Sequence, residues 1–282
     1  MPFAVCDGIN IRYEITGNGP PLLLFSPGGF NATLEQWSAL GVYKKIQPLK
    51  WLSRHFTCIA FDRRECGQSG GRVERVTFAH FVRQAAALLD HLDIESAHLM
   101  GGCMGCAPVA AFGVMKPERV RSMILWWPVG GPKYRLSSQM RMARHLAFVE
   151  TEGLQGVVDL VQRDGKPFNA DPRGGPWASV IRNDPEFATG YSQHDAEKYK
   201  TLVAGMARTM FDRDTAPGAE PEDMMQLDIP ALVVPGNDAF HATSAARYLQ
   251  ECLPQSQYWD MEVDGQTTEA SSTRVLEFLN GV

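Results

Sequence analysis

The sequence predicts an α/β protein with a mostly parallel central sheet flanked by helices, because short apolar runs alternate with segments of helical spacing. The apolar runs are the expected strands, at residues 9–15, 21–25, 56–62, 96–101, 120–128, 229–238 and 256–263. The helices are expected between them, at residues 43–52, 78–92, 105–117, 243–253 and 272–279. A second observation is that this alternation stops near residue 130 and resumes only near residue 226.

Each element has its own local signal. INIRYEI (9–15) alternates apolar and polar residues, and the turn GNGP separates it from the buried run PLLLF (21–25). FAHFVRQAAALLDHL (78–92) gathers its apolar residues on one helical side. Pro117 ends the helix that begins at GCAPV.

The break in the pattern predicts a helical insertion after the strand at residues 120–128, which is the sixth strand when the opening hairpin is counted as two. The segment is polar and of helical character, and it is longer than an ordinary loop. We therefore expect a core domain formed by residues 1–129 and 226–282, and a helical cap formed by residues 130–225.

Composition excludes several classes of function. The 282 residues carry a net charge of −5 with scattered basic residues, which gives no electrostatic reason to expect a nucleic-acid partner. No apolar run approaches the roughly 18 residues that span a bilayer, and the N-terminus lacks a signal-peptide pattern. Six cysteines are too few for a secreted disulfide framework. We expect a cytoplasmic protein with a small-molecule substrate, no membrane partner, no cofactor and no metal; a homo-oligomer is compatible with the sequence.

The stretch HLMGGCMGCAPVAAF (98–112) allows three interpretations. Small residues around Cys103 are typical of a tight turn that presents a nucleophile. Cys103 and Cys106 also form a Cys-x-x-Cys pair, as in thiol oxidoreductases. The third interpretation is a buried crossover between a strand and a helix.

Four segments together resemble the α/β-hydrolases of the capped type. They are the opening DGINIRYEITGNGPPLLLF, the segment IAFDRRECGQSG (59–70), the stretch GGCMGC and the segment LVVPGNDAFHA (232–242). In the second of these, Glu65 stands where the family's motif has a glycine. The resemblance implies a central sheet with a nucleophile at its carboxyl edge.

The resemblance also implies roles for individual residues. Cys103 would be the nucleophile, since Gly101 and Gly105 are the small residues that the turn demands. The oxyanion hole would use the amide of Met104 and one from the loop SPGGF, whose candidates are Gly28, Gly29 and Phe30. Asp238 matches the acid that orients the catalytic histidine.

The family's histidine is absent from its usual place. After the last strand the family normally has Gly-His, and here the residues are Gly265 and Gln266. Glutamine cannot act as a base, but Gln266 could position a water or the substrate together with Asp238. The alternatives are a distant histidine (His145, His194 or His241), Asp238 itself as base, or chemistry that needs no such proton transfer.

The segment WWPVGGPKYR leads into the cap and offers Trp127 and Arg135 as substrate contacts. Its aromatic character favours a small hydrophobic or aromatic substrate. The sequence thus favours an enzyme that acts on an ester, thioester or activated carbonyl through Cys103, without the usual histidine. A non-hydrolytic lyase, isomerase or small-molecule binding protein is the alternative, and a thiol redox protein is a third possibility.

Overall fold

The computed structural model describes residues 2–282 and contains one eight-stranded sheet. The strands are β1 Phe3–Cys6, β2 Ile9–Thr16, β3 Pro21–Phe25, β4 Thr57–Phe61, β5 Ala97–Gly102, β6 Val120–Trp126, β7 Ala231–Val234 and β8 Ser256–Tyr258. They lie in the order β1-β2-β4-β3-β5-β6-β7-β8. From β4 to β8 all neighbours are parallel, and the β1–β2 hairpin joins this block antiparallel.

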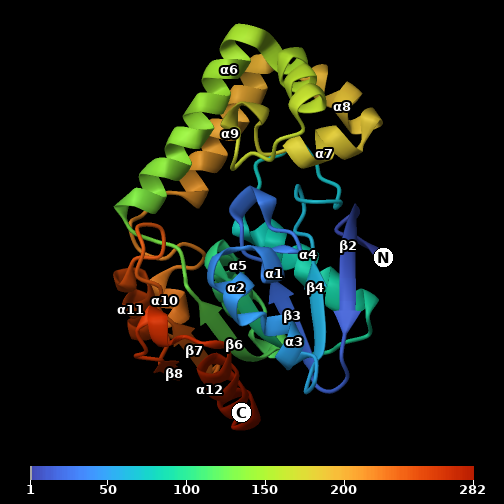
Figure 1. The fold of residues 1–282 in the computed structure, drawn as a ribbon. Helices are drawn as coiled ribbons and strands as arrows, with labels where there is room; N and C mark the ends of the chain where they lie inside the picture. The colour runs from blue at the N-terminus through green and yellow to red at the C-terminus, as the bar shows by residue number, and fades with distance from the viewer. Residues whose placement is uncertain (1) are drawn as a thin grey trace.

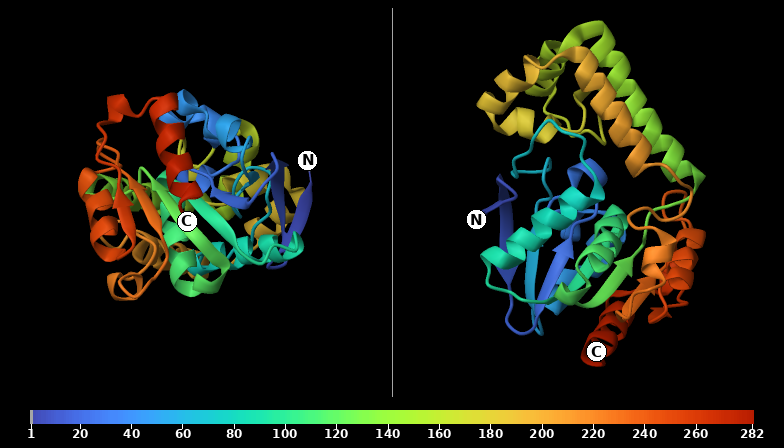
Figure 2. Two further views of the ribbon diagram at one scale, coloured as in Figure 1. Left: turned by 90° about the horizontal axis from the view of Figure 1, so that it is seen from below. Right: turned by 180° about the vertical axis from the view of Figure 1, so that it is seen from behind.

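Helices cover both faces of the sheet, as Figures 1 and 2 show. In the first part of the chain they are α1 Gln36–Ala39, α2 Gly41–Ile46, α3 Pro48–Leu52, α4 Phe78–His91 and α5 Cys106–Met115. After β7 they are α11 Thr243–Cys252 and α12 Thr268–Asn280. The central strands are buried on both sides, so their apolar side chains fill two layers of core. The fold class is therefore the one that the alternating pattern predicts.

The segment between β6 and β7 is helical and lies over one edge of the sheet (Figure 1). It contains α6 Pro132–Asp164, α7 Ala178–Asn183, α8 Pro185–Ser192, α9 Ala196–Met210 and α10 Pro221–Met224. Helices α6 and α9 run side by side and, with α7 and α8, bury a separate apolar core. α6 bends at Gly153, where a φ of 66° departs from helical geometry and glycine carries no Cβ penalty.

The carboxyl ends of the parallel strands meet beneath this helical segment, and the loops after β3, β5, β6 and β7 converge there. In doubly wound sheets, ligands bind at this edge. A buried network supports the first of these loops: the Asp62 carboxylate accepts the N–H of Leu34 at 2.9 Å and that of Gln68 at 2.9 Å, and it pairs with Arg12 at 3.2 Å. The motif around residues 62–69 is thus a support for the site and not part of it.

Some elements differ from the sequence expectation. The strand expected at 256–263 is only three residues long, since the chain leaves the sheet after Tyr258. The helix expected at 43–52 is two helices, because Gln47 has a left-handed φ of 48° and Pro48 begins a new one. Across residues 2–282, none of the helices has both the length and the apolar character needed to cross a bilayer.

Candidate active site

Cys103 lies at a sharp turn between β5 and α5. Its φ of 54° is left-handed, a conformation that costs a non-glycine residue energy and is found at functional sites. A Cβ on Gly101 would lie 2.5 Å from the Gly105 carbonyl oxygen, and a Cβ on Gly105 would collide with the carbonyl oxygen of Phe25. The close approach of strand and helix explains both glycines, and it holds the Cys103 sulfur at the mouth of the sheet.

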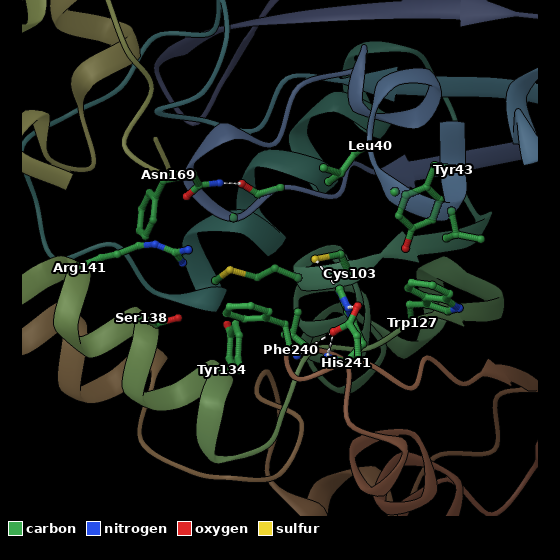
Figure 3. Close-up of a pocket in the computed structure, with 18 of the residues that line it drawn as sticks. Leu40, Tyr43, Cys103, Trp127, Tyr134, Ser138, Arg141, Asn169, Phe240 and His241 are labelled. Carbon is green, nitrogen blue, oxygen red and sulfur yellow. Dashed lines mark hydrogen bonds and ion pairs between the residues drawn. The ribbon is translucent and has the colours of Figure 1, made fainter. Parts of the chain in front are cut away.

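The Cys103 sulfur has a histidine partner. His241 Nε2 lies 3.2 Å from Cys103 Sγ, and His241 Nδ1 lies 2.8 Å from Asp238 Oδ2 (Figure 3). The three side chains form a sulfur–imidazole–carboxylate array with the connectivity of a catalytic triad. The usual place after β8 holds Gln266, as the sequence indicates, and of the histidines left open as alternatives it is His241, in the loop after β7, that contacts Cys103.

A four-residue turn fixes the relation between Asp238 and His241. Asp238 Oδ1 accepts the backbone N–H of Phe240 at 2.7 Å and that of His241 at 3.0 Å, while Oδ2 faces the imidazole. Gly236 permits the fold of this turn, since a Cβ there would lie 2.7 Å from the His241 Cβ. The sequence signal was an Asp-x-x-His spacing at the end of a buried strand, which is compatible with an Asx turn.

The charges of the array favour an ion pair between protonated His241 and the Asp238 carboxylate. Burial by itself would lower the pKa of His241, but the Cys103 sulfur and the Asp238 carboxylate outweigh it and raise that pKa to about 9. Burial alone would raise the pKa of Asp238, yet its bonds to His241 and to backbone N–H groups bring it below the ordinary value. The protonated imidazole is therefore favoured at neutral pH, with the Asp238 carboxylate at one ring nitrogen and the Cys103 sulfur at the other.

Gln266 was expected to position a water or the substrate, but its side chain has a structural role. Its side chain is fully buried and lies outside the pocket lining. Its Oε1 accepts the indole N–H of Trp127 at 2.8 Å, and its Nε2 donates to the carbonyl oxygens of Pro235 and Met261. Both ends of the amide are thus occupied. Trp127 in turn packs its ring against His241, with centroids 5.5 Å apart, so Gln266 supports the histidine from a distance.

Replacing Gln266 with alanine is expected to lower the free energy of unfolding by about 2–4 kcal/mol, since it leaves a cavity and removes the hydrogen-bond partner of the half-buried Trp127 indole. Urea denaturation measures this change. The matched control is Gln250→Ala on the exposed side of α11, which should change the unfolding free energy by less than about 0.5 kcal/mol. Equal losses in both variants would contradict the structural role of Gln266.

The other two histidines considered from the sequence lie elsewhere. His145 is buried in the cap, where its ring nitrogens contact the Arg173 carbonyl at 2.8 Å and the Tyr199 hydroxyl at 2.6 Å. Burial lowers its pKa to about 4, only partly offset by the bond to Arg173. His194 is exposed and does not line the pocket. Neither imidazole reaches Cys103.

The candidate oxyanion donors lie beside the sulfur. Gly28, Gly29, Phe30 and Met104 all line the pocket. The Arg63 guanidinium binds the Gly29 carbonyl. Because the C=O and N–H of one trans peptide point in opposite directions, this bond turns the Phe30 N–H away from Arg63. The side-chain amide of Asn169 donates a hydrogen bond to the carbonyl oxygen of Gly28, which lies in the same loop as Gly29, at 2.6 Å.

The pocket has a volume of about 280 Å³ and lies between the sheet edge and α6. Near the sulfur its wall is formed by Leu40, Val42, Tyr43 and Trp127, and Phe168 and Phe211 come from the cap. α6 contributes Tyr134, Ser138 and Arg141, which share one helical face (Figure 3). Arg135, expected as a substrate contact, lies one residue out of phase; it pairs with Asp214 at 2.7 Å and does not line the pocket.

The Cys-x-x-Cys interpretation finds no support in the geometry. The Cys106 thiol is buried and donates to the carbonyl oxygens of Gly101 at 3.2 Å and Trp126 at 3.4 Å. Burial raises its pKa well above the ordinary value, which disfavours the thiolate that thiol exchange requires. All six cysteines are free thiols.

Comparison with known proteins supports the fold. A family model described as alpha/beta hydrolase fold matches residues 21–148. The dihydrolipoyllysine-residue acetyltransferase component of the acetoin cleaving system from Cupriavidus necator is 35% identical over 128 residues, which cover 45% of this chain and 32% of that protein. The protein of the same name from Pseudomonas putida is 32% identical and covers 95% of this chain and 65% of its own length. This chain thus spans less than two thirds of either relative.

Among solved structures, the enol-lactonase from Burkholderia xenovorans LB400 is similar to this chain with a TM-score of 0.61 and 20% identity. The match covers 99% of this chain and 100% of that one. At this level of identity the similarity shows a shared fold.

Proposed function

Because the chain has the α/β-hydrolase fold, we propose that it hydrolyses the ester or thioester bond of a small acyl compound through a Cys103–His241–Asp238 triad. The observation that carries the proposal is the contact of His241 Nε2 with Cys103 Sγ at 3.2 Å, inside the pocket. The mostly apolar wall supports a small hydrophobic or aromatic acyl or leaving group.

In the first step the Cys103 thiolate attacks the acyl carbon. The carbonyl oxygen becomes an oxyanion, which the amides of Met104 and Phe30 would stabilise. When the bond to the leaving group breaks, its oxygen or sulfur takes the proton from His241 Nε2, leaving a neutral imidazole and a thioester on Cys103.

In the second step His241 Nε2 takes a proton from water, whose oxygen attacks the thioester carbon. The carbon–sulfur bond then breaks, the carboxylic acid leaves, and the thiolate–imidazolium pair is restored. The pKa of His241 assists this change of role: part of what raises it is the Cys103 sulfur, and that contribution ends when the sulfur is acylated. The imidazole can therefore act as an acid in the first step and as a base in the second.

The presence of an imidazole at the sulfur also bears on the non-hydrolytic alternative. That alternative rested on the lack of a base to hydrolyse the thioester, and His241 provides one. The contacts of the triad thus favour a complete hydrolytic cycle over a stalled acyl enzyme or a purely binding protein.

The proposal is tested by mixing the protein with 4-nitrophenyl butyrate and following released nitrophenolate and intact protein mass together. We expect steady turnover, with a single butyryl group on Cys103 in samples quenched by acid. Cys252→Ser serves as the control, since Cys252 lies on α11 away from the pocket and should leave both signals unchanged. A protein that releases no nitrophenolate and carries no adduct would refute the proposal.

A further inference from the structure

The cap end of the pocket presents a positive charge without a counter-ion. Arg141 lines the cavity from α6, and within residues 2–282 no carboxylate lies close enough to form an ion pair with its guanidinium. Other arginines nearby have protein partners: Arg135 binds Asp214, and Arg63 binds the Gly29 carbonyl. A cation in a largely apolar cavity loses hydration, so its natural partner is a ligand with negative charge.

A second group at the same end also lacks a partner. The Tyr134 side chain is only 6% exposed, and its hydroxyl has no hydrogen-bond partner within residues 2–282. It lines the same cavity and lies on the same face of α6 as Arg141 (Figure 3). A buried hydroxyl without a hydrogen bond costs free energy, and this cost is recovered if a ligand accepts its proton.

The two groups are both hydrogen-bond donors and face the same cavity. Ser138 lies between them on α6 and adds another hydroxyl to the lining. The pocket contains no second arginine and no lysine, so the wall matches one negative charge better than two. Its one carboxylate, Asp238, belongs to the triad at the other end. A carboxylate fits this arrangement, because a guanidinium and a hydroxyl can bind its two oxygens.

We infer that the substrate of Cys103 carries a free carboxylate, held by Arg141 and the Tyr134 hydroxyl, at a distance from the carbonyl that Cys103 attacks. This inference rests on the proposed function and narrows its substrate class to acyl compounds with a second, ionised end. Figure 3 shows Tyr134, Ser138 and Arg141 at one part of the cavity and the Cys103–His241 pair at another, so one small molecule can reach both.

The test compares two substrates that differ only in this charge: the mono-4-nitrophenyl ester of glutarate, and the same compound with its carboxylate methylated. The wild-type protein is expected to favour the acid in kcat/KM by about tenfold or more. Arg141→Met should lower kcat/KM for the acid by about 10- to 100-fold and leave the neutral ester within about threefold. Turnover of the neutral ester shows that the variant is folded.

Arg144→Met is the matched control, because Arg144 lies on the same helix, is exposed and does not line the pocket. It should keep the preference of the wild-type protein. Tyr134→Phe, which removes one oxygen atom, should reduce the preference for the acid by a smaller factor than Arg141→Met. Equal kcat/KM for both compounds in the wild-type protein, or an equal loss for both in Arg141→Met, would overturn the inference.

A binding measurement separates this inference from the proposed function. Free glutarate is titrated calorimetrically into Cys103→Ala and into the double variant Cys103→Ala/Arg141→Met. Binding that the second change weakens at least about tenfold supports the carboxylate site even if no ester is hydrolysed. Ester turnover together with glutarate binding that is independent of Arg141 would overturn the carboxylate site and leave the hydrolase proposal standing.

Discussion

Replacing Cys103 with alanine is expected to lower kcat/KM for aryl ester hydrolysis by about 10⁴-fold or more, because the nucleophile that forms the acyl intermediate is gone. The variant should also lose the butyryl adduct in intact mass spectra. Its fold should persist: the elbow owes its shape to Gly101 and Gly105, and alanine takes up less space than cysteine at the mouth of the pocket.

Cys103→Ser gives a finer comparison. A serine hydroxyl has a far higher pKa than a thiol, so His241 would have to remove its proton during attack instead of beforehand. We expect Cys103→Ser to be slower than the wild-type protein by at least about 10²-fold and to keep its residual rate only while His241 is present. A Cys103→Ser or Cys103→Ala protein with full activity would show that another residue attacks the substrate.

His241→Gln is the second large effect that we expect. Loss of the acid and base should lower the steady-state rate by about 10²- to 10⁴-fold. Since hydrolysis of the thioester depends on a base, the butyryl adduct on Cys103 should persist in this variant under conditions where the wild-type protein clears it. His194→Gln is the control, because His194 is exposed and lies outside the pocket.

The pH dependence gives an independent reading of the same residue. The raised pKa means that His241 keeps its proton up to about pH 9, and that the acid which assists a poor leaving group is lost above this value. For an alkyl ester or thioester, the acylation rate of the wild-type protein should therefore fall above about pH 9. With 4-nitrophenyl esters the leaving group needs no proton, so this alkaline fall should be smaller. His241→Gln should show no such difference between the two substrates.

The fold could be predicted from the sequence because buried strands appear in it as runs of apolar residues. Runs such as PLLLF and ALVV are apolar throughout since parallel strands are covered on both faces. The elbow was also predictable, because two close backbone approaches admit only glycine at positions 101 and 105. In each case one local constraint determines the residue type.

The proposed base and the proposed carboxylate contact depend on features that a sequence pattern does not display. His241 reaches Cys103 only because a side-chain turn at Asp238 directs it there, and the family pattern drew attention to Gln266 instead. Arg141 and Arg135 differ only in helical phase, and the phase depends on where α6 begins and on how it packs against the sheet edge. A choice between two arginines on one helix needs the three-dimensional arrangement.

The turn at residues 238–241 reduces the number of independent chain segments that must position the side chains of this site. When the acid and the base are carried by separate loops, the nucleophile, the base and the acid must be aligned with one another, and each loop contributes its own positional fluctuation. Here the Asp238 side chain makes three hydrogen bonds within four residues, two of them to His241, so one short turn positions both side chains. The only distance that remains to be set is the one between this turn and the Cys103 sulfur. In the proposed mechanism the segment after β8 takes no direct part in the chemistry, so changes in its length should alter stability more than proton transfer.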